Sequence, residues 1–157
     1  MAMPMRLAAI AVLGGLCAAG LSAGMAAAVA ETPEQIIAER QAGYKKMGEA
    51  VDTMKKTVQA GGDVRPLAAA ARDIAAFGRR IPTLFPPGTE SGHKTRAKPN
   101  IWTDRAGFDA AAAKLPPAAE KLASLAEAGD TAGFVAQFKQ MGATCGACHR
   151  EYRTKEE

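Results

Sequence analysis

A five-residue motif near the C-terminus, Cys-Gly-Ala-Cys-His at positions 145–149, restricts the fold of this 157-residue chain more than any other feature. On a helix, Cys145 and Cys148 share one face because they are three positions apart, and His149 follows directly. Two thiols and an imidazole at this spacing are typical of a covalently attached haem whose iron is ligated by the histidine. The motif therefore predicts one haem c per chain and a fold that encloses it.

A dithiol without haem is the alternative interpretation of this motif. A zinc site needs about four Cys or His ligands, and outside the motif and the N-terminal segment only His93 could contribute. A thioredoxin-like dithiol normally lies in a βαβ context, which the helical patterns of this chain do not provide. This alternative is a haem-free exported helical bundle whose dithiol binds metal or exchanges disulfides.

The first 30 residues have the pattern of a secretory signal peptide. Arg6 gives a positive start, residues 7–21 form an apolar run, and residues 28–30 have the small-x-small form of a cleavage site. Glycines interrupt the run, which is short for a membrane span of about 20 residues. We expect cleavage of residues 1–30, a haem domain at residues 31–157, a periplasmic location and no membrane attachment after cleavage.

Composition favours helices and gives no sign of nucleic-acid binding. The chain is rich in alanine and only 5% aromatic, which favours helices over strands. Loss of the signal would remove Arg6 from the 20 basic residues and leave 19 against 16 acidic ones, a formal charge of +3. Two haem propionates would bring this charge close to neutral, so we expect no nucleic-acid or membrane partner.

Caps and breakers divide the chain into predicted helices at residues 32–60, 63–81, 100–128 and 130–152. A kink or a short break is expected in the third helix, at its adjacent prolines. The breaker-rich residues 82–99 are too long for a tight turn and form a crossover loop between the second and third helices. Two helix pairs joined by this loop predict an all-α fold, an antiparallel four-helix bundle.

The first and last helices carry seams of residues that face the predicted core. The seam of the last helix contains Phe134, Phe138, Met141, Cys145, Cys148 and Tyr152. The seam of the first helix contains Ile37, Arg40, Tyr44, Met47, Val51, Met54 and Val58. Arg40 is the exception among these residues, because a buried guanidinium needs an anionic partner, for which a haem propionate would serve. The alternative is that Arg40 extends to solvent near the helix end.

Several stretches of the chain resemble the class II c-type cytochromes, whose high-spin members are the cytochromes c′. These stretches are residues 40–48, 85–89, 98–102 and 145–153, and the resemblance covers essentially the whole chain after the signal. The C-terminal motif is its most specific part, since most other c-type cytochromes carry the haem motif near the N-terminus. The resemblance implies a four-helix bundle, the fold for which cytochrome c′ is a known example.

The resemblance also implies roles for particular residues. Cys145 and Cys148 hold the haem by thioethers, and His149 is the proximal iron ligand with Arg153 close to it. Arg40 lies near the propionates. The residues that surround the haem are then Arg40, Tyr44, Met47, Trp102 and Arg153, of which Trp102 packs at the haem edge or is an ordinary core residue.

The second axial position distinguishes functions within this family. Low-spin members place a methionine there and carry electrons with six-coordinate iron, whereas high-spin members place a non-coordinating side chain at the same point. Alignment on Arg40 puts Tyr44 at this position, and tyrosine, with a reference pKa of about 10, is a poor iron ligand without a strong base nearby. Met47, one turn further on, is the rival sixth ligand.

Our main hypothesis is a non-enzymatic periplasmic cytochrome that transfers single electrons and binds small diatomic gases, nitric oxide especially, at an open distal site. The alternative is a low-spin, six-coordinate class II cytochrome that acts purely as an electron carrier with Met47 as sixth ligand. The resemblance further implies redox partner proteins and a homodimer that packs its first and second helices together.

Overall fold

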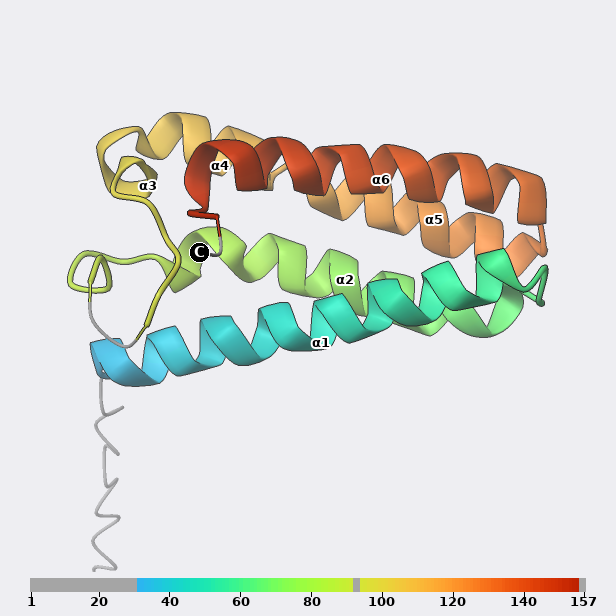
Figure 1. Cartoon of the computed structure of the whole chain (residues 1–157), viewed down its shortest axis with the longest axis horizontal. Coiled ribbons are helices and arrows are strands. Elements are labelled where there is room, and N and C mark those ends of the chain that lie inside the picture. Colours follow the sequence, from blue (N-terminus) through green and yellow to red (C-terminus); the bar gives the residue numbers. More distant parts are fainter. Residues whose placement is uncertain (1–30, 92–93, 156–157) are drawn as a thin grey trace, which may run out of the picture. The chain divides into compact units, whose positions relative to one another are not determined.

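The computed structural model describes residues 31–91 and 94–155, and within them the chain is helical with no β-strand (Figure 1). The predicted signal and His93 lie outside these residues. The elements are α1 (Pro33–Gln59), η1 (Arg65–Leu67), α2 (Ala68–Arg80), η2 (Ile81–Leu84), α3 (Asn100–Thr103), α4 (Arg105–Ala112), α5 (Leu115–Ala128) and α6 (Thr131–Tyr152). None of the described helices is long and apolar enough to span a membrane.

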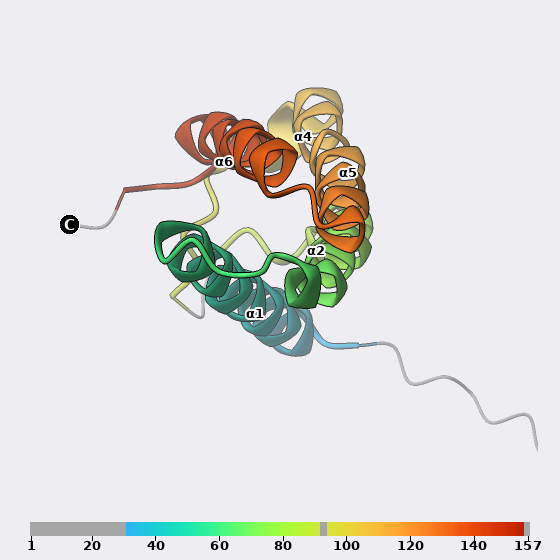
Figure 2. The ribbon, with the colours of Figure 1, turned by 90° about the vertical axis from the view of Figure 1, so that its right-hand side faces the viewer.

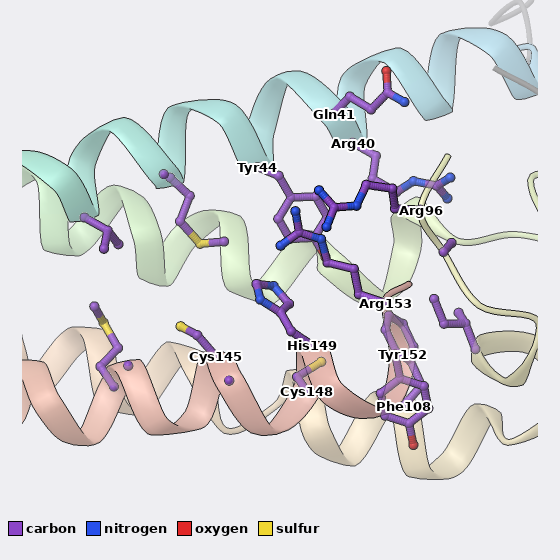
Figure 3. Close-up of a pocket in the computed structure, with 18 of the residues that line it drawn as sticks. Arg40, Gln41, Tyr44, Arg96, Phe108, Cys145, Cys148, His149, Tyr152 and Arg153 are labelled. Atoms are coloured by element: carbon purple, nitrogen blue, oxygen red, sulfur yellow. The ribbon is translucent and has the colours of Figure 1, made fainter. Parts of the chain in front are cut away.

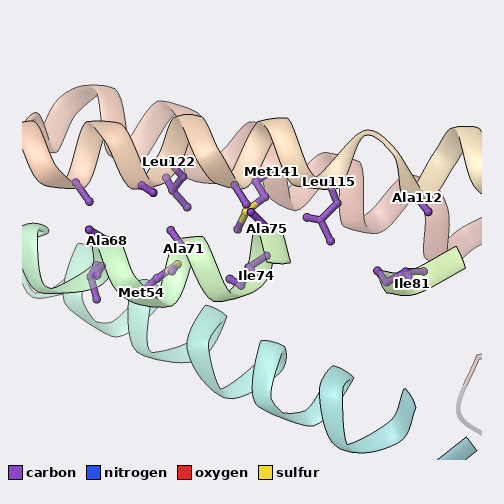
Figure 4. Close-up of a cluster of buried hydrophobic side chains, with 14 of the residues drawn as sticks. Met54, Ala68, Ala71, Ile74, Ala75, Ile81, Ala112, Leu115, Leu122 and Met141 are labelled. Atoms are coloured by element: carbon purple, nitrogen blue, oxygen red, sulfur yellow. The ribbon is translucent and has the colours of Figure 1, made fainter. Parts of the chain in front are cut away.

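The long helices α1, α2, α5 and α6 form the predicted antiparallel four-helix bundle (Figure 2). The packing of α2 against α5 is the most extensive, followed by that of α5 against α6, and α1 rests more lightly on α2. Buried side chains between α2 and α5 include Ile74, Leu115 and Leu122, with Met141 entering from α6 (Figure 4). The all-α prediction is therefore confirmed, with the core concentrated on the α2 and α5 side.

Two predicted helix starts are confirmed by their caps. Thr32 forms a capping box with Gln35, in which the Gln35 backbone N–H donates to Thr32 Oγ1 at 3.3 Å and the Thr32 N–H donates to Gln35 Oε1 at 2.7 Å. Asp130 Oδ1 accepts from the Gly133 N–H at 2.8 Å at the start of α6. Gly129 precedes this cap with φ of 69°, a left-handed conformation that favours glycine.

The predicted start of the second helix at Asp63 is wrong. Asp63 Oδ1 accepts a hydrogen bond from the Arg65 N–H at 3.0 Å and closes a turn, and the α-helix begins only at Ala68. Pro66 lies in the intervening η1, where its missing N–H costs no helical hydrogen bond.

The predicted third helix is divided into α3, α4 and α5. Asp104 leaves helical geometry with φ of −116° and ψ of 56°, and its side chain then caps α4 by accepting from the Gly107 N–H at 3.2 Å. The short break expected at the adjacent prolines is confirmed: it falls just before Leu115, and Pro116 and Pro117 lie in the first turn of α5. Prolines are tolerated there because the first N–H groups of a helix have no intrahelical acceptor.

The crossover loop is confirmed between α2 and α3, and side chains beyond it tie it to the bundle. Arg105 donates from Nη1 to the Phe85 carbonyl at 3.0 Å and from Nη2 to the Pro82 carbonyl at 2.8 Å. Trp102 Nε1 donates to the Pro86 carbonyl at 3.1 Å. These bonds satisfy loop carbonyls and hold the loop across one end of the bundle.

Leu122→Ala should destabilise the folded protein by about 2–5 kcal/mol, because it removes fully buried methyl groups and leaves a cavity between α2 and α5. The free energy of unfolding can be measured by urea denaturation of the haem-loaded protein. Leu125→Ala, at a half-buried position on the same helix, is the matched control and should lower the free energy of unfolding by less. Equal losses for the two variants would contradict this account of the core.

Candidate cofactor site

A cavity of about 840 Å³ lies between α1 and α6 (Figure 3). Its walls come from α1 on one side, α6 on the other, and the crossover loop at one end, with Ile101 and Phe108 adding apolar surface from α3 and α4. Cavities that bind cofactors and other small molecules usually measure about 300–1,000 Å³ and are mostly apolar. The size and lining of this cavity are therefore suitable for a large planar cofactor.

The α6 wall brings together the three reactive side chains of the sequence motif. Cys145, Cys148 and His149 are all half-buried and line the cavity (Figure 3). Both cysteines are free thiols, and burial raises the pKa of each above that of an ordinary cysteine. Burial, with help from Arg153 and Arg96, lowers the pKa of His149. The imidazole is therefore neutral at pH 7 and keeps a nitrogen lone pair for a metal ion.

The α1 wall places both rival distal residues in the same space. Tyr44 and Met47 each line the cavity, and Tyr44 extends from α1 on the side opposite the motif (Figure 3). The Tyr44 ring packs edge-on against Phe77 at 5.3 Å between centroids. Burial is the main reason that the pKa of Tyr44 is raised well above its ordinary value, so its hydroxyl is protonated at neutral pH. A protonated phenol is a hydrogen-bond donor and a weak metal ligand.

Arg40 is buried, with only 3% of its surface exposed, so the alternative in which it extends to solvent is wrong. Its Nη1 donates to the Leu84 carbonyl at 3.1 Å and its Nη2 donates to Thr95 Oγ1 at 2.8 Å. The guanidinium also lies 4.2 Å from the centre of the Phe85 ring. Neutral groups thus satisfy part of its hydrogen bonding, and its charge faces a cavity that could receive an anionic group.

The C-terminal end of α6 is held against the crossover loop. The Lys98 N–H donates to the Tyr152 carbonyl at 3.0 Å, and the Thr154 N–H donates to the Arg96 carbonyl at 2.9 Å. These bonds satisfy a carbonyl of the last helical turn, where intrahelical donors run out. They fix the turn that carries His149.

This contact brings Arg96 to the cavity beside Arg153 (Figure 3). Arg153 was expected near the histidine from the sequence, whereas Arg96 was not. The only sequence signal for Arg96 is the run of basic residues at 94–98 in the crossover loop, which by itself indicates a solvated loop equally well.

Trp102 is not among the described residues that line the cavity. Its indole packs at 5.9 Å from the Phe85 ring, and Phe85 itself lines the cavity. Trp102 therefore supports the wall from behind, and its expected place at the haem edge stays a prediction.

No group of three or more His, Cys, Asp or Glu side chains within the described residues is placed to hold a metal ion. A porphyrin supplies four nitrogen donors itself, so an imidazole with two neighbouring thiols is a sufficient set for a covalently attached haem.

Comparison with known proteins gives consistent matches. The family model described as "Cytochrome C'" matches residues 35–153. The chain is 34% identical over 145 residues to cytochrome c′ of Allochromatium vinosum, covering 90% of this chain and 94% of that protein. It is 43% identical over 83 residues to cytochrome c′ of Rhodospirillum rubrum, a stretch that covers 53% of this chain and only 56% of that relative.

The fold agrees with these sequence matches. Cytochrome c′ from Thermochromatium tepidum superposes with a TM-score of 0.76 and 32% sequence identity, covering 80% of this chain and 98% of that one. Together with the Cys-Gly-Ala-Cys-His motif on the cavity wall, these matches show that the chain belongs to the cytochrome c′ family and carries a haem c as its cofactor.

Proposed function

We propose that this chain is a periplasmic cytochrome that transfers single electrons and binds small gas molecules, nitric oxide especially, at an open face of its haem. The observation that carries the proposal is that the two sides of the cavity differ in chemistry. The α6 side presents two thiols and an imidazole, and the α1 side presents a protonated tyrosine opposite them. When bound, the haem supplies an iron redox couple and a coordination position.

The α6 side chains hold and orient the cofactor in this proposal. Cys145 and Cys148 form the thioether links, and His149 supplies the proximal nitrogen. Arg40 and Arg153, with Arg96, give a cationic end to the cavity that suits the two propionates. This set explains why a buried guanidinium is tolerated on the inner seam of α1.

The α1 side chains control access to the opposite face. Tyr44 is held in place by Phe77 and covers this face without ligating iron, because its buried hydroxyl keeps its proton. Met47 lines the same cavity, and for that reason the low-spin electron carrier with Met47 as sixth ligand is the second candidate function.

Gas binding is supported by a solved relative. The nitric oxide complex of a mutant cytochrome c prime from Alcaligenes xylosoxidans superposes on this chain with a TM-score of 0.72 and 30% identity, covering 82% of this chain. That protein binds nitric oxide in the same fold. In this chain Tyr44 would lie beside the bound gas and could donate a hydrogen bond to it.

Export fits this function. Residues 1–30 act as a cleaved signal in the proposal, and residues 31–157 form the haem domain in the periplasm. Redox partner proteins exchange electrons with it there, and the protein turns over no substrate of its own. The haem c cofactor removes the alternative of a haem-free dithiol protein.

The double variant Cys145→Ser with Cys148→Ser should lose covalently bound haem, because only thioether-linked haem remains on a denatured chain. Haem staining of a denaturing gel measures this directly. Ala143→Ser with Ala147→Ser adds two serines at exposed positions of the same helix and should keep full staining. Staining of the cysteine double variant would contradict the assigned attachment sites.

Met47→Ala should leave the ferric absorption spectrum high-spin and unchanged, because Met47 is a packing residue in our proposal. Tyr44→Met places a thioether opposite His149 and should shift the spectrum toward a low-spin form. A methionine–iron charge-transfer band in the unmodified protein that disappears in Met47→Ala would instead establish the electron-carrier alternative.

The protein should sediment as a homodimer at micromolar concentration. A similar solved structure is described as a cytochrome c′ with an unusual ligand-controlled dimer dissociation, and it is 31% identical to this chain. Sedimentation velocity with and without carbon monoxide measures both association and its dependence on ligand. A monomer under both conditions would contradict the dimer.

A further inference from the structure

The charged side chains that line the cavity are all basic. They come from α1, the crossover loop, α6 and the residue that follows α6, and within the described residues no Asp or Glu joins them. The six residues are Arg40, Lys55, Lys94, Arg96, Lys139 and Arg153. Because the whole chain has 20 basic and 16 acidic residues, this one-sided lining is a local feature and not a consequence of overall composition.

The cavity opens to solvent between α1 and α6. Gly48 and Lys55 on α1, and Lys139 and Gly142 on α6, line the cavity and are themselves exposed. A Cβ atom at Gly48 or Gly142 would meet nothing within 4 Å outside the adjacent backbone of its own helix, so open space adjoins each of these two positions. Lys55 and Lys139 therefore stand on opposite sides of this opening.

The charge at the opening exceeds what the cofactor requires. Two propionates would neutralise two of the six cations, and Arg40 is buried deep in the cavity beside Thr95. Lys55 and Lys139 form no ion pair with the described acidic residues. On the opposite side of the bundle, by contrast, Arg79 pairs with Glu120 at 2.8 Å. Unpaired positive charge is therefore present on both helices that border the cofactor opening.

We propose that this opening, with Lys55 and Lys139 on its two rims, is the docking surface for an acidic redox partner protein. A local positive field attracts an acidic surface and raises its association rate without requiring a high net charge. Short exposed side chains on α6, Ala143 before the haem motif and Ala147 within it, would let such a surface approach the cofactor. The inference rests on the proposed electron transfer.

Two small oxidants of opposite charge can test whether the electrostatic field at the cavity opening is positive. Stopped-flow oxidation of the reduced haem protein is measured with anionic ferricyanide and with a cationic tris(phenanthroline)cobalt(III) complex; each takes one electron from the protein, and no bond is made or broken. In the double variant Lys55→Glu with Lys139→Glu, oxidation of the haem by ferricyanide at low salt should be slower by about tenfold or more. Oxidation by the cobalt complex should be faster. The ferricyanide rate of the unmodified protein should fall as salt rises.

Lys114→Glu with Lys121→Glu is the matched control. It makes the same change in net charge at exposed positions outside the cavity lining, and its rates should stay within about twofold of the unmodified protein. Equal rate changes in the two double variants would overturn the docking surface while leaving electron transfer intact. If neither complex oxidises the reduced haem of the unmodified protein, the proposed electron transfer itself would be overturned.

A macromolecular probe tests the kind of partner. A fluorescent polyglutamate peptide should bind the haem-loaded protein in a salt-dependent manner, bind the Lys55→Glu, Lys139→Glu variant about tenfold more weakly, and bind the control variant normally. Phosphatidylglycerol vesicles serve as the second probe. Binding to the vesicles without binding to the peptide would overturn a protein partner at this surface. The haem absorption spectrum and the far-ultraviolet circular dichroism of each variant confirm that it is folded.

Discussion

The structure depends on keeping two helices of a small bundle apart. The cavity between α1 and α6 must stay open for a planar cofactor, yet apolar surfaces in water tend to close on one another. Packing on the opposite side of the bundle resists this closure: α2 and α5 share the main core, in which Ile74, Leu115 and Leu122 are buried. The cofactor then occupies the position that a fourth packed seam would fill in an ordinary bundle.

The crossover loop is the second support of the cavity. Arg40 reaches from α1 to loop carbonyls and to Thr95, and the loop in turn bonds to the end of α6 through the Lys98 and Tyr152 backbones. One end of the cavity is thereby closed by polar contacts, and neutral groups satisfy part of the hydrogen bonding of the buried guanidinium. A loop of this length is tolerated because its backbone groups find partners at both ends.

The α6 and α1 sides of the cavity have different chemical roles. The α6 wall presents Cys145, Cys148 and His149, which in our proposal attach the haem and ligate its iron. On the α1 wall, we propose that a single side chain facing the iron determines whether its sixth coordination position is open. Tyr44 combines an aromatic cover with a protonated hydroxyl, and this combination differs from a purely apolar cover in offering a donor to whatever binds there.

The sequence by itself determined the helical class, the capping of α1 and α6, and the cofactor, because these depend on spacing along one helix: the i, i+3 cysteines, the Thr32 capping box and the Asp130 cap. It could not locate the starts of α2 and α5, where turn geometry and prolines compete over a few residues. Only the tertiary structure decided that Arg40 is buried with neutral partners, that Arg96 joins Arg153 at the cavity, and that the charged side chains lining the cavity are all basic among the residues that the structure describes. Those properties depend on which distant segments meet in space, and no pattern along a single helix records them.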